Sequence, residues 1–100
     1  MAATVPASAG YQEGLNAFSE GDYEEAMREW RAVVDGQADA VLPPIYAETH
    51  YAIATLYWRG LGVEQDYDRA REWLLRAAEL DHAEAQGKLG EHPDVLYAGF

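Results

Sequence analysis

The side chains of this 100-residue chain that could bind a metal or transfer a proton are three histidines and eighteen acidic residues. The histidines are His50, His82 and His92, and no two of them have the i, i+4 spacing that places two imidazoles on one face of a helix. A calcium loop that began at Asp66 would need glycine at its sixth position, where the chain has Arg71. We therefore predict no metal site.

Nucleophiles and phosphate-binding loops are equally poorly supported. The chain has no cysteine, which excludes thiolate zinc sites and cysteine nucleophiles. Ser8 and Ser19 are the only serines, and neither lies in a Gly-x-Ser-x-Gly motif. The run Gly60-Leu61-Gly62 lacks the preceding strand and the lysine of a phosphate-binding loop, so a turn is favoured. The sequence predicts no catalytic residue, no cofactor and no enzymatic activity.

The excess of acidic over basic residues argues against some classes of binding partner. Eighteen acidic residues against seven basic ones give a net charge of −11. Such a surface repels nucleic-acid phosphates and anionic lipids, so neither is an expected partner. No apolar run is long enough for membrane insertion. The acidic run at 20–25 is typical of a solvated helix start, and a basic peptide docked there is the alternative.

Apolar residues recur at helical spacing along most of the chain, and no stretch of useful length alternates with period two. The clearest stripe has the spacing i, i+3, i+4, i+7, i+8 and consists of Ala70, Trp73, Leu74, Ala77 and Ala78. Together with the turn residues between the stripes, this pattern predicts five helices and no sheet. The expected helices cover residues 8–20, 22–35, 44–59, 66–80 and 82–89.

Short acidic residues and glycines mark the expected helix ends. Asp22, Asp66 and Asp81 precede helices, where a carboxylate can accept hydrogen bonds from the first-turn amides. Gly60 and Gly62 are expected to supply the positive φ angles of a tight turn between two helices.

The helices form two hairpins with similar sequences. Gly21-Asp22-Tyr23-x-x-Ala26 in the first hairpin corresponds to Gln65-Asp66-Tyr67-x-x-Ala70 in the second, and a tryptophan follows each run. Paired helices with an internal repeat are typical of a helical solenoid.

The second hairpin carries a longer motif, Tyr51-x-Ile53-Ala54-x-x-Tyr57-x-x-Gly60-Leu61-Gly62-Val63-x-x-Asp66-Tyr67-x-Arg69-Ala70-x-x-Trp73-x-x-Arg76-Ala77-Ala78. From Thr49 onward the chain thereby resembles the Sel1-like repeat family, a relative of the tetratricopeptide repeats. The first hairpin is more similar to a tetratricopeptide unit. Residues 83–90 look like the opening of another repeat, in which Ala85 follows Thr49 by 36 residues, a period that this family uses.

The resemblance implies an all-α fold, a short right-handed solenoid of two helix hairpins with a C-terminal helix and a capping tail. We expect a flexible N-terminal segment at 1–9, the repeat domain at 10–90 and the capping tail at 91–100. The tripeptide Ala7-Ser8-Ala9 has the form of a signal-peptidase site, which leaves both a cytoplasmic and a periplasmic location open.

The implied function is that of a protein–protein interaction module, an adaptor or scaffold that binds a partner protein or peptide on a concave face. The first helix of each pair would line that face, with Tyr11, Leu15, Tyr51, Thr55, Trp58 and Arg59 as partner-binding residues. Trp58 either packs on the insertion at 42–44 or is exposed as an interface anchor. Two alternatives stay open: a homodimer formed through the apolar tail at 95–100, and a small-ligand or metal carrier.

We expect Trp73→Ala to lower the free energy of unfolding by roughly 3–5 kcal/mol, because Trp73 lies on the predicted core stripe. Chemical denaturation followed by circular dichroism measures the change in free energy, and a thermal melt measures the change in melting temperature. A variant that melts within a degree of the parent would show that Trp73 is not a core residue.

Overall fold

The computed structural model describes residues 10–36 and 42–91 of the chain. These residues form five helices and no strand, in agreement with the predicted all-α class. The helices are α1 (Tyr11–Ser19), α2 (Tyr23–Gly36), α3 (Pro43–Arg59), α4 (Tyr67–Glu79) and α5 (Ala83–Glu91). Each begins and ends within three residues of its predicted bounds. The predicted flexible segment 1–9 lies outside the described residues, and so does the predicted tail from residue 92 onward.

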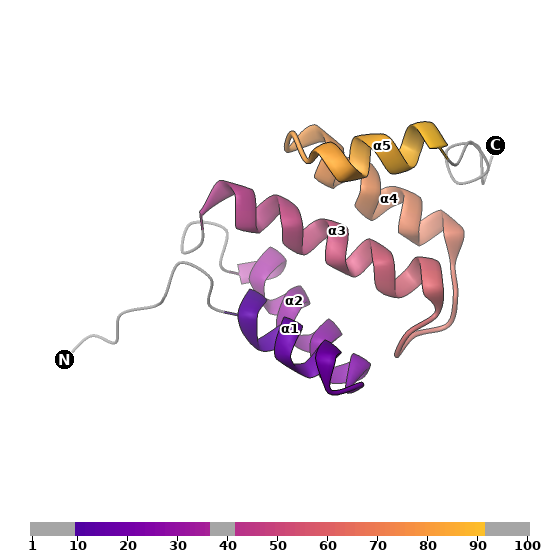
Figure 1. The fold of residues 1–100 in the computed structure, drawn as a ribbon. Helices are drawn as coiled ribbons and strands as arrows, with labels where there is room; N and C mark the ends of the chain where they lie inside the picture. Colours follow the sequence, from indigo (N-terminus) through magenta and orange to yellow (C-terminus); the bar gives the residue numbers. More distant parts are fainter. Residues whose placement is uncertain (1–9, 37–41, 92–100) are drawn as a thin grey trace.

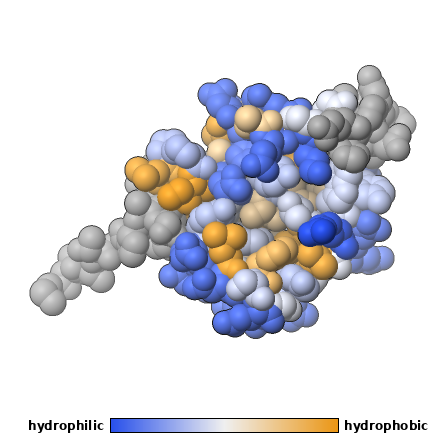
Figure 2. All heavy atoms as spheres, in the orientation of Figure 1, coloured by the Kyte–Doolittle hydropathy of each residue, from blue (hydrophilic) through white to orange (hydrophobic). Residues whose placement is uncertain are grey.

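Each helix packs against the helices that precede and follow it in the sequence. Figure 1 shows α1, α3 and α5 toward the viewer, with the fainter α2 and α4 behind them. The first helices of successive hairpins therefore share one face of the molecule, as a helical solenoid requires. Figure 2, drawn from the same side, shows orange and pale spheres among the blue hydrophilic residues of this face.

Trp30 fills the core of the first hairpin and is only 2% exposed. Its indole lies near the rings of Tyr11 and Phe18, and its Nε1–H donates to the carbonyl of Tyr11 at 3.1 Å. Gly14 on α1 leaves the space for this indole, since a Cβ at that position would overlap the ring. A glycine inside a helix is thus explained by the tryptophan that packs against it.

The second hairpin buries the motif residues that were predicted as its core. Trp73 is 8% exposed, and Ala70 and Ala77 on the same helix are fully buried. These small residues let α3 and α4 approach closely, and Ile53 and Leu56 fill the interface from α3. The guanidinium of Arg76 covers one face of Trp73, 4.9 Å from the ring centroid.

The tight turn after α3 has the predicted geometry. Gly60 and Gly62 have φ angles of 68° and 72°, a region that disfavours residues with a Cβ. Gly62 also lies against the start of α2, where an added Cβ would stand 2.8 Å from the carbonyl carbon of Tyr23. The turn of the second hairpin is therefore in close contact with the backbone of the first. Asp66 caps α4 as predicted and accepts from the Arg69 amide at 3.1 Å.

The predicted cap at Asp81 is wrong. Asp81 has a φ angle of 65° and occupies the left-handed position that closes α4. Helix α5 therefore begins one residue later, and the Ala85 amide donates to Nδ1 of His82 at 3.1 Å. The imidazole, and not the carboxylate, satisfies the first turn of α5.

One of the two alternatives for Trp58 on α3 is excluded. Trp58 does not pack on residues 42–44, because Pro43 and Trp58 belong to the same helix and lie about 22 Å apart along its axis. His50, also on α3, is only 6% exposed and lies between the rings of Tyr46 and Trp73. The Nδ1 atom of His50 lies 2.8 Å from the Tyr46 carbonyl, which satisfies that nitrogen within its own helix.

We expect Gly14→Ala to lower the free energy of unfolding by about 1–3 kcal/mol, since the new methyl group would displace the buried Trp30 indole. Gly87→Ala is the matched control, because a Cβ at Gly87 meets no atom within 4 Å. That variant should gain up to about 1 kcal/mol from the higher helix propensity of alanine. Urea denaturation of both variants measures the changes, and effects of equal sign would contradict the packing.

Stability should fall on acidification through His50. Burial lowers the pKa of His50 below its ordinary value of 6.5, and the nearby Arg76 lowers it further. The unfolded chain therefore takes up a proton at this residue at a higher pH than the folded chain does, so stability is lost as the pH falls below about 6.5. Denaturation curves from pH 8 to pH 5 should show a shallower loss in His50→Gln than in the parent. Equal slopes would contradict this assignment.

Candidate functional site

One face of α3 carries four of the residues that were predicted to bind a partner. Tyr51, Thr55, Trp58 and Arg59 have the spacing i, i+4, i+7, i+8 and so share one side of the helix. The core residues Ile53 and Leu56 point elsewhere and are fully buried. The packing of α3 in the core thus fixes which way the four residues face.

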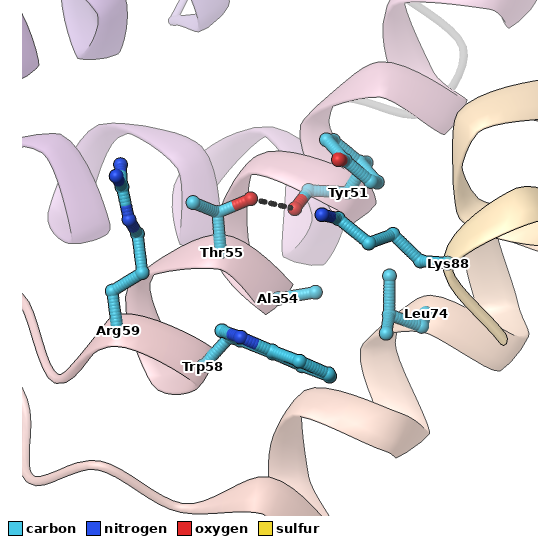
Figure 3. A pocket seen from close by; sticks show the side chains of 7 residues that line it. All are labelled: Tyr51, Ala54, Thr55, Trp58, Arg59, Leu74 and Lys88. Carbon is cyan, nitrogen blue, oxygen red and sulfur yellow. Dashed lines mark hydrogen bonds between the residues drawn. The ribbon is translucent and has the colours of Figure 1, made fainter. Parts of the chain in front are cut away.

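These side chains line a groove of about 250 Å³, named here the α3–α5 groove (Figure 3). Its lining comes from three helices and consists of Tyr51, Ala54, Thr55, Trp58 and Arg59 of α3, Leu74 of α4 and Lys88 of α5. In Figure 3 the Trp58 indole extends below Ala54 toward Leu74, which gives the groove an apolar wall. Lys88 reaches in from α5 on the opposite side.

Contacts outside the groove hold Trp58 in place. Its ring lies 5.4 Å from the ring of Tyr67 at the start of α4. The side-chain amide of Gln65 donates to the Trp58 carbonyl at 2.7 Å and lies 3.2 Å from the Tyr67 hydroxyl. The half-buried indole is therefore positioned by the turn that joins α3 to α4. A side chain ordered in advance loses less entropy when a partner binds.

The Tyr51 side of the groove is supported by a cluster of polar side chains. The Tyr51 ring stacks on His82 with 4.7 Å between the ring centroids. Nδ1 of His82 accepts from the backbone, so its Nε2–H donates to the carboxylate of Glu48 on α3. Burial raises the pKa of Tyr11 to about 12, and the neighbouring Glu48 carboxylate adds to this shift. The contacts of His82 with Tyr51 and Glu48 join α3 to the start of α5, and Tyr11 of α1 lies near the same carboxylate.

The charged groups that line the groove are both cationic. Arg59 stands at the end of α3, and Lys88 lies in the last turn of α5. Among residues 10–36 and 42–91, no carboxylate forms an ion pair with either side chain. Glu84 lines a neighbouring depression together with Tyr51, Gly87 and Lys88.

The structure therefore brings four of the six predicted site residues into one groove. Tyr11 and Leu15 lie on α1, where both are half-buried against the core. Leu74 was not predicted as a site residue because its spacing marks a core residue, and Lys88 was not predicted because it lies on another helix. The 36-residue repeat gives no signal for Lys88, because its counterpart on the preceding first helix is Ala52, which does not line the groove.

The described residues contain no group of three or more histidine, aspartate or glutamate side chains that could hold a metal ion. None of the five helices is both long and apolar enough to cross a bilayer. His92, the third histidine, lies outside the part of the chain that the structure describes.

Comparison with known protein families gives a match over the second hairpin. Residues 47–82 match the family model described as Sel1 repeat. No curated protein and no solved structure shows significant similarity to the chain. The matched segment contains α3 from residue 47 onward, the glycine turn and α4, which together supply most of the groove.

Sel1 repeats are non-catalytic helical repeats that generally mediate interactions between proteins. The resemblance predicted from the motif at residues 51–78 is thereby confirmed. Residues 47–82 of the chain form a Sel1 repeat.

Proposed function

We propose that this protein is an adaptor that binds a segment of a partner protein in the α3–α5 groove and has no catalytic activity of its own. The observation that carries the proposal is the convergence of Tyr51, Thr55, Trp58 and Arg59 with Leu74 and Lys88 around one groove. The Sel1 repeat over residues 47–82 supports the same class of function.

The size of the groove suits one or two side chains of a peptide. Its volume of about 250 Å³ lies below the roughly 300–1,000 Å³ that is typical of small-molecule sites. Its walls are two helices and a lysine from a third, an arrangement that can receive an amphipathic helix or an extended segment. A small-ligand carrier is therefore less well supported than a peptide-binding module.

The chemistry of the lining also fits an interface. Tryptophan, tyrosine and arginine are the residues that most often carry the binding energy of protein interfaces. Trp58, Tyr51 and Arg59 supply one of each, and all three lie on a single face of α3. Homodimer formation through the tail at 95–100 involves residues outside the described ones and stays a prediction.

The acidic run at 20–25 is a weaker candidate for docking. Asp22 accepts from the Glu25 amide at 3.2 Å and so caps α2. The Glu25 carboxylate pairs with Arg28 on the same helix. These contacts support the interpretation of the run as a solvated helix start.

We expect Trp58→Ala to weaken partner binding by about thirtyfold or more, the loss typical of a tryptophan anchor. Affinity capture from the native host, with the parent and the variant in parallel, identifies the proteins whose recovery depends on Trp58. Leu75→Ala is the control, because Leu75 is exposed on α4 and does not line the groove. If the parent and Trp58→Ala recover the same proteins in equal amounts, the groove is not the binding site.

A further inference from the structure

Two of the seven basic residues of this acidic chain line the α3–α5 groove. Within the described parts of the chain, Arg28, Arg31 and Arg69 each pair with a carboxylate three or four residues away. Over residues 10–36 and 42–91, Arg59 and Lys88 have no such carboxylate partner. The groove thus concentrates positive charge on a protein whose net charge is −11.

We propose that the α3–α5 groove selects a partner segment in which an acidic side chain stands next to an apolar one. The carboxylate would lie between Arg59 and Lys88, and the apolar side chain would pack against Trp58. This inference rests on the proposed function and specifies the chemistry of the partner.

The positions of the side chains support this division of the groove. In Figure 3 the Lys88 ammonium points toward Tyr51 and Thr55, and the Arg59 side chain extends on the far side of Thr55. The Thr55 hydroxyl between them donates to the Tyr51 carbonyl at 3.1 Å. Arg59 and Lys88 thus form a cationic rim. The Trp58 indole and Leu74 lie on the other side of this rim and form the apolar surface.

Glu84 restricts where an acidic side chain of the partner can bind. It lies one turn before Lys88 on α5 and lines the adjoining depression, where it would repel a second carboxylate. An acidic residue of the partner is therefore favoured between Arg59 and Lys88. It is disfavoured next to Glu84, which lies nearer the start of α5. A lysine or arginine at that rim would face two like charges and would be excluded.

The acidic surface elsewhere on the molecule repels an acidic partner, but this repulsion acts only over a long distance. Salt at physiological strength screens charges beyond about 8 Å, whereas contacts inside the groove are screened less. The local cations therefore decide the preference once the partner has reached the groove. A basic peptide drawn to the acidic surface would behave differently, since its binding would not depend on Arg59 or Lys88.

Three matched sets of fluorescent peptides test the proposal. Each set contains random sequences around a central leucine or phenylalanine, and the flanking position is glutamate, glutamine or lysine. Fluorescence polarisation against the full chain should give the tightest binding for the glutamate set and the weakest for the lysine set. Arg59→Gln and Lys88→Gln should each weaken binding of the glutamate set by about two- to fivefold. Lys88→Glu should reverse the preference between the glutamate and lysine sets.

Arg28→Gln is the control for net charge, because it removes one positive charge from an exposed position on α2. It should leave the preference for the glutamate set unchanged. Thermal melts of all variants separate binding from folding, since Arg59 and Lys88 also lie in the last turns of their helices, where cations are stabilising. A variant that melts earlier but keeps the preference would show that its cation serves the helix and not the partner, which overturns the proposal.

The remaining outcomes separate this proposal from the proposed function. If Trp58→Ala abolishes binding of all three sets while Arg59→Gln and Lys88→Gln change nothing, the groove is the site and the charge selection is wrong. If the lysine set binds most tightly to the parent, the selection is also wrong. If no set binds, or if Trp58→Ala binds all sets as the parent does, both proposals fail.

Discussion

Helix α3 has to be apolar on two sides at once, because α2 and α4 both pack against it. This requirement explains why seven of its residues are buried, among them the polar Thr49 and His50. Both polar side chains are satisfied within the helix itself, Thr49 through the Ile45 carbonyl at 2.7 Å and His50 through the Tyr46 carbonyl at 2.8 Å. A helix packed in this way has little rotational freedom, so its remaining face, which carries Tyr51 and Trp58, is fixed as well.

The groove is supported from behind at both ends of that face. At one end Gln65 and Tyr67 hold Trp58, and at the other end His82 stacks against Tyr51. Neither support uses an atom of a ligand, so the walls are in place before any partner arrives. Such preorganisation lowers the entropic cost of association and suits a module whose task is recognition.

Much of this architecture could be predicted from the sequence, because helix periodicity and turn chemistry are local properties. The five helices, the left-handed glycines at 60 and 62 and the cap at Asp66 all follow from neighbouring residues. The grouping of Tyr51, Thr55, Trp58 and Arg59 could be predicted for the same reason, since all four lie on one helix. Lys88 and Leu74 could not be assigned to the groove, because their placement depends on how α4 and α5 pack against α3. The Asp81 cap failed because a cap also depends on the backbone angle of the residue, and here the angle is left-handed.

The close approach between Gly62 and the backbone of Tyr23 bears on how firmly the two hairpins are held together. Repeat arrays are often pictured as strings of separable units, each of which can open or be removed without disturbing the next. In this chain the turn of one hairpin lies against the first residues of the other, and Gly62 brings no side chain to this contact. Pulling the two hairpins apart would expose backbone as well as apolar surface, so the molecule has no weak joint at its middle. A cut between residues 36 and 42 would therefore yield two fragments that remain associated rather than two independent halves.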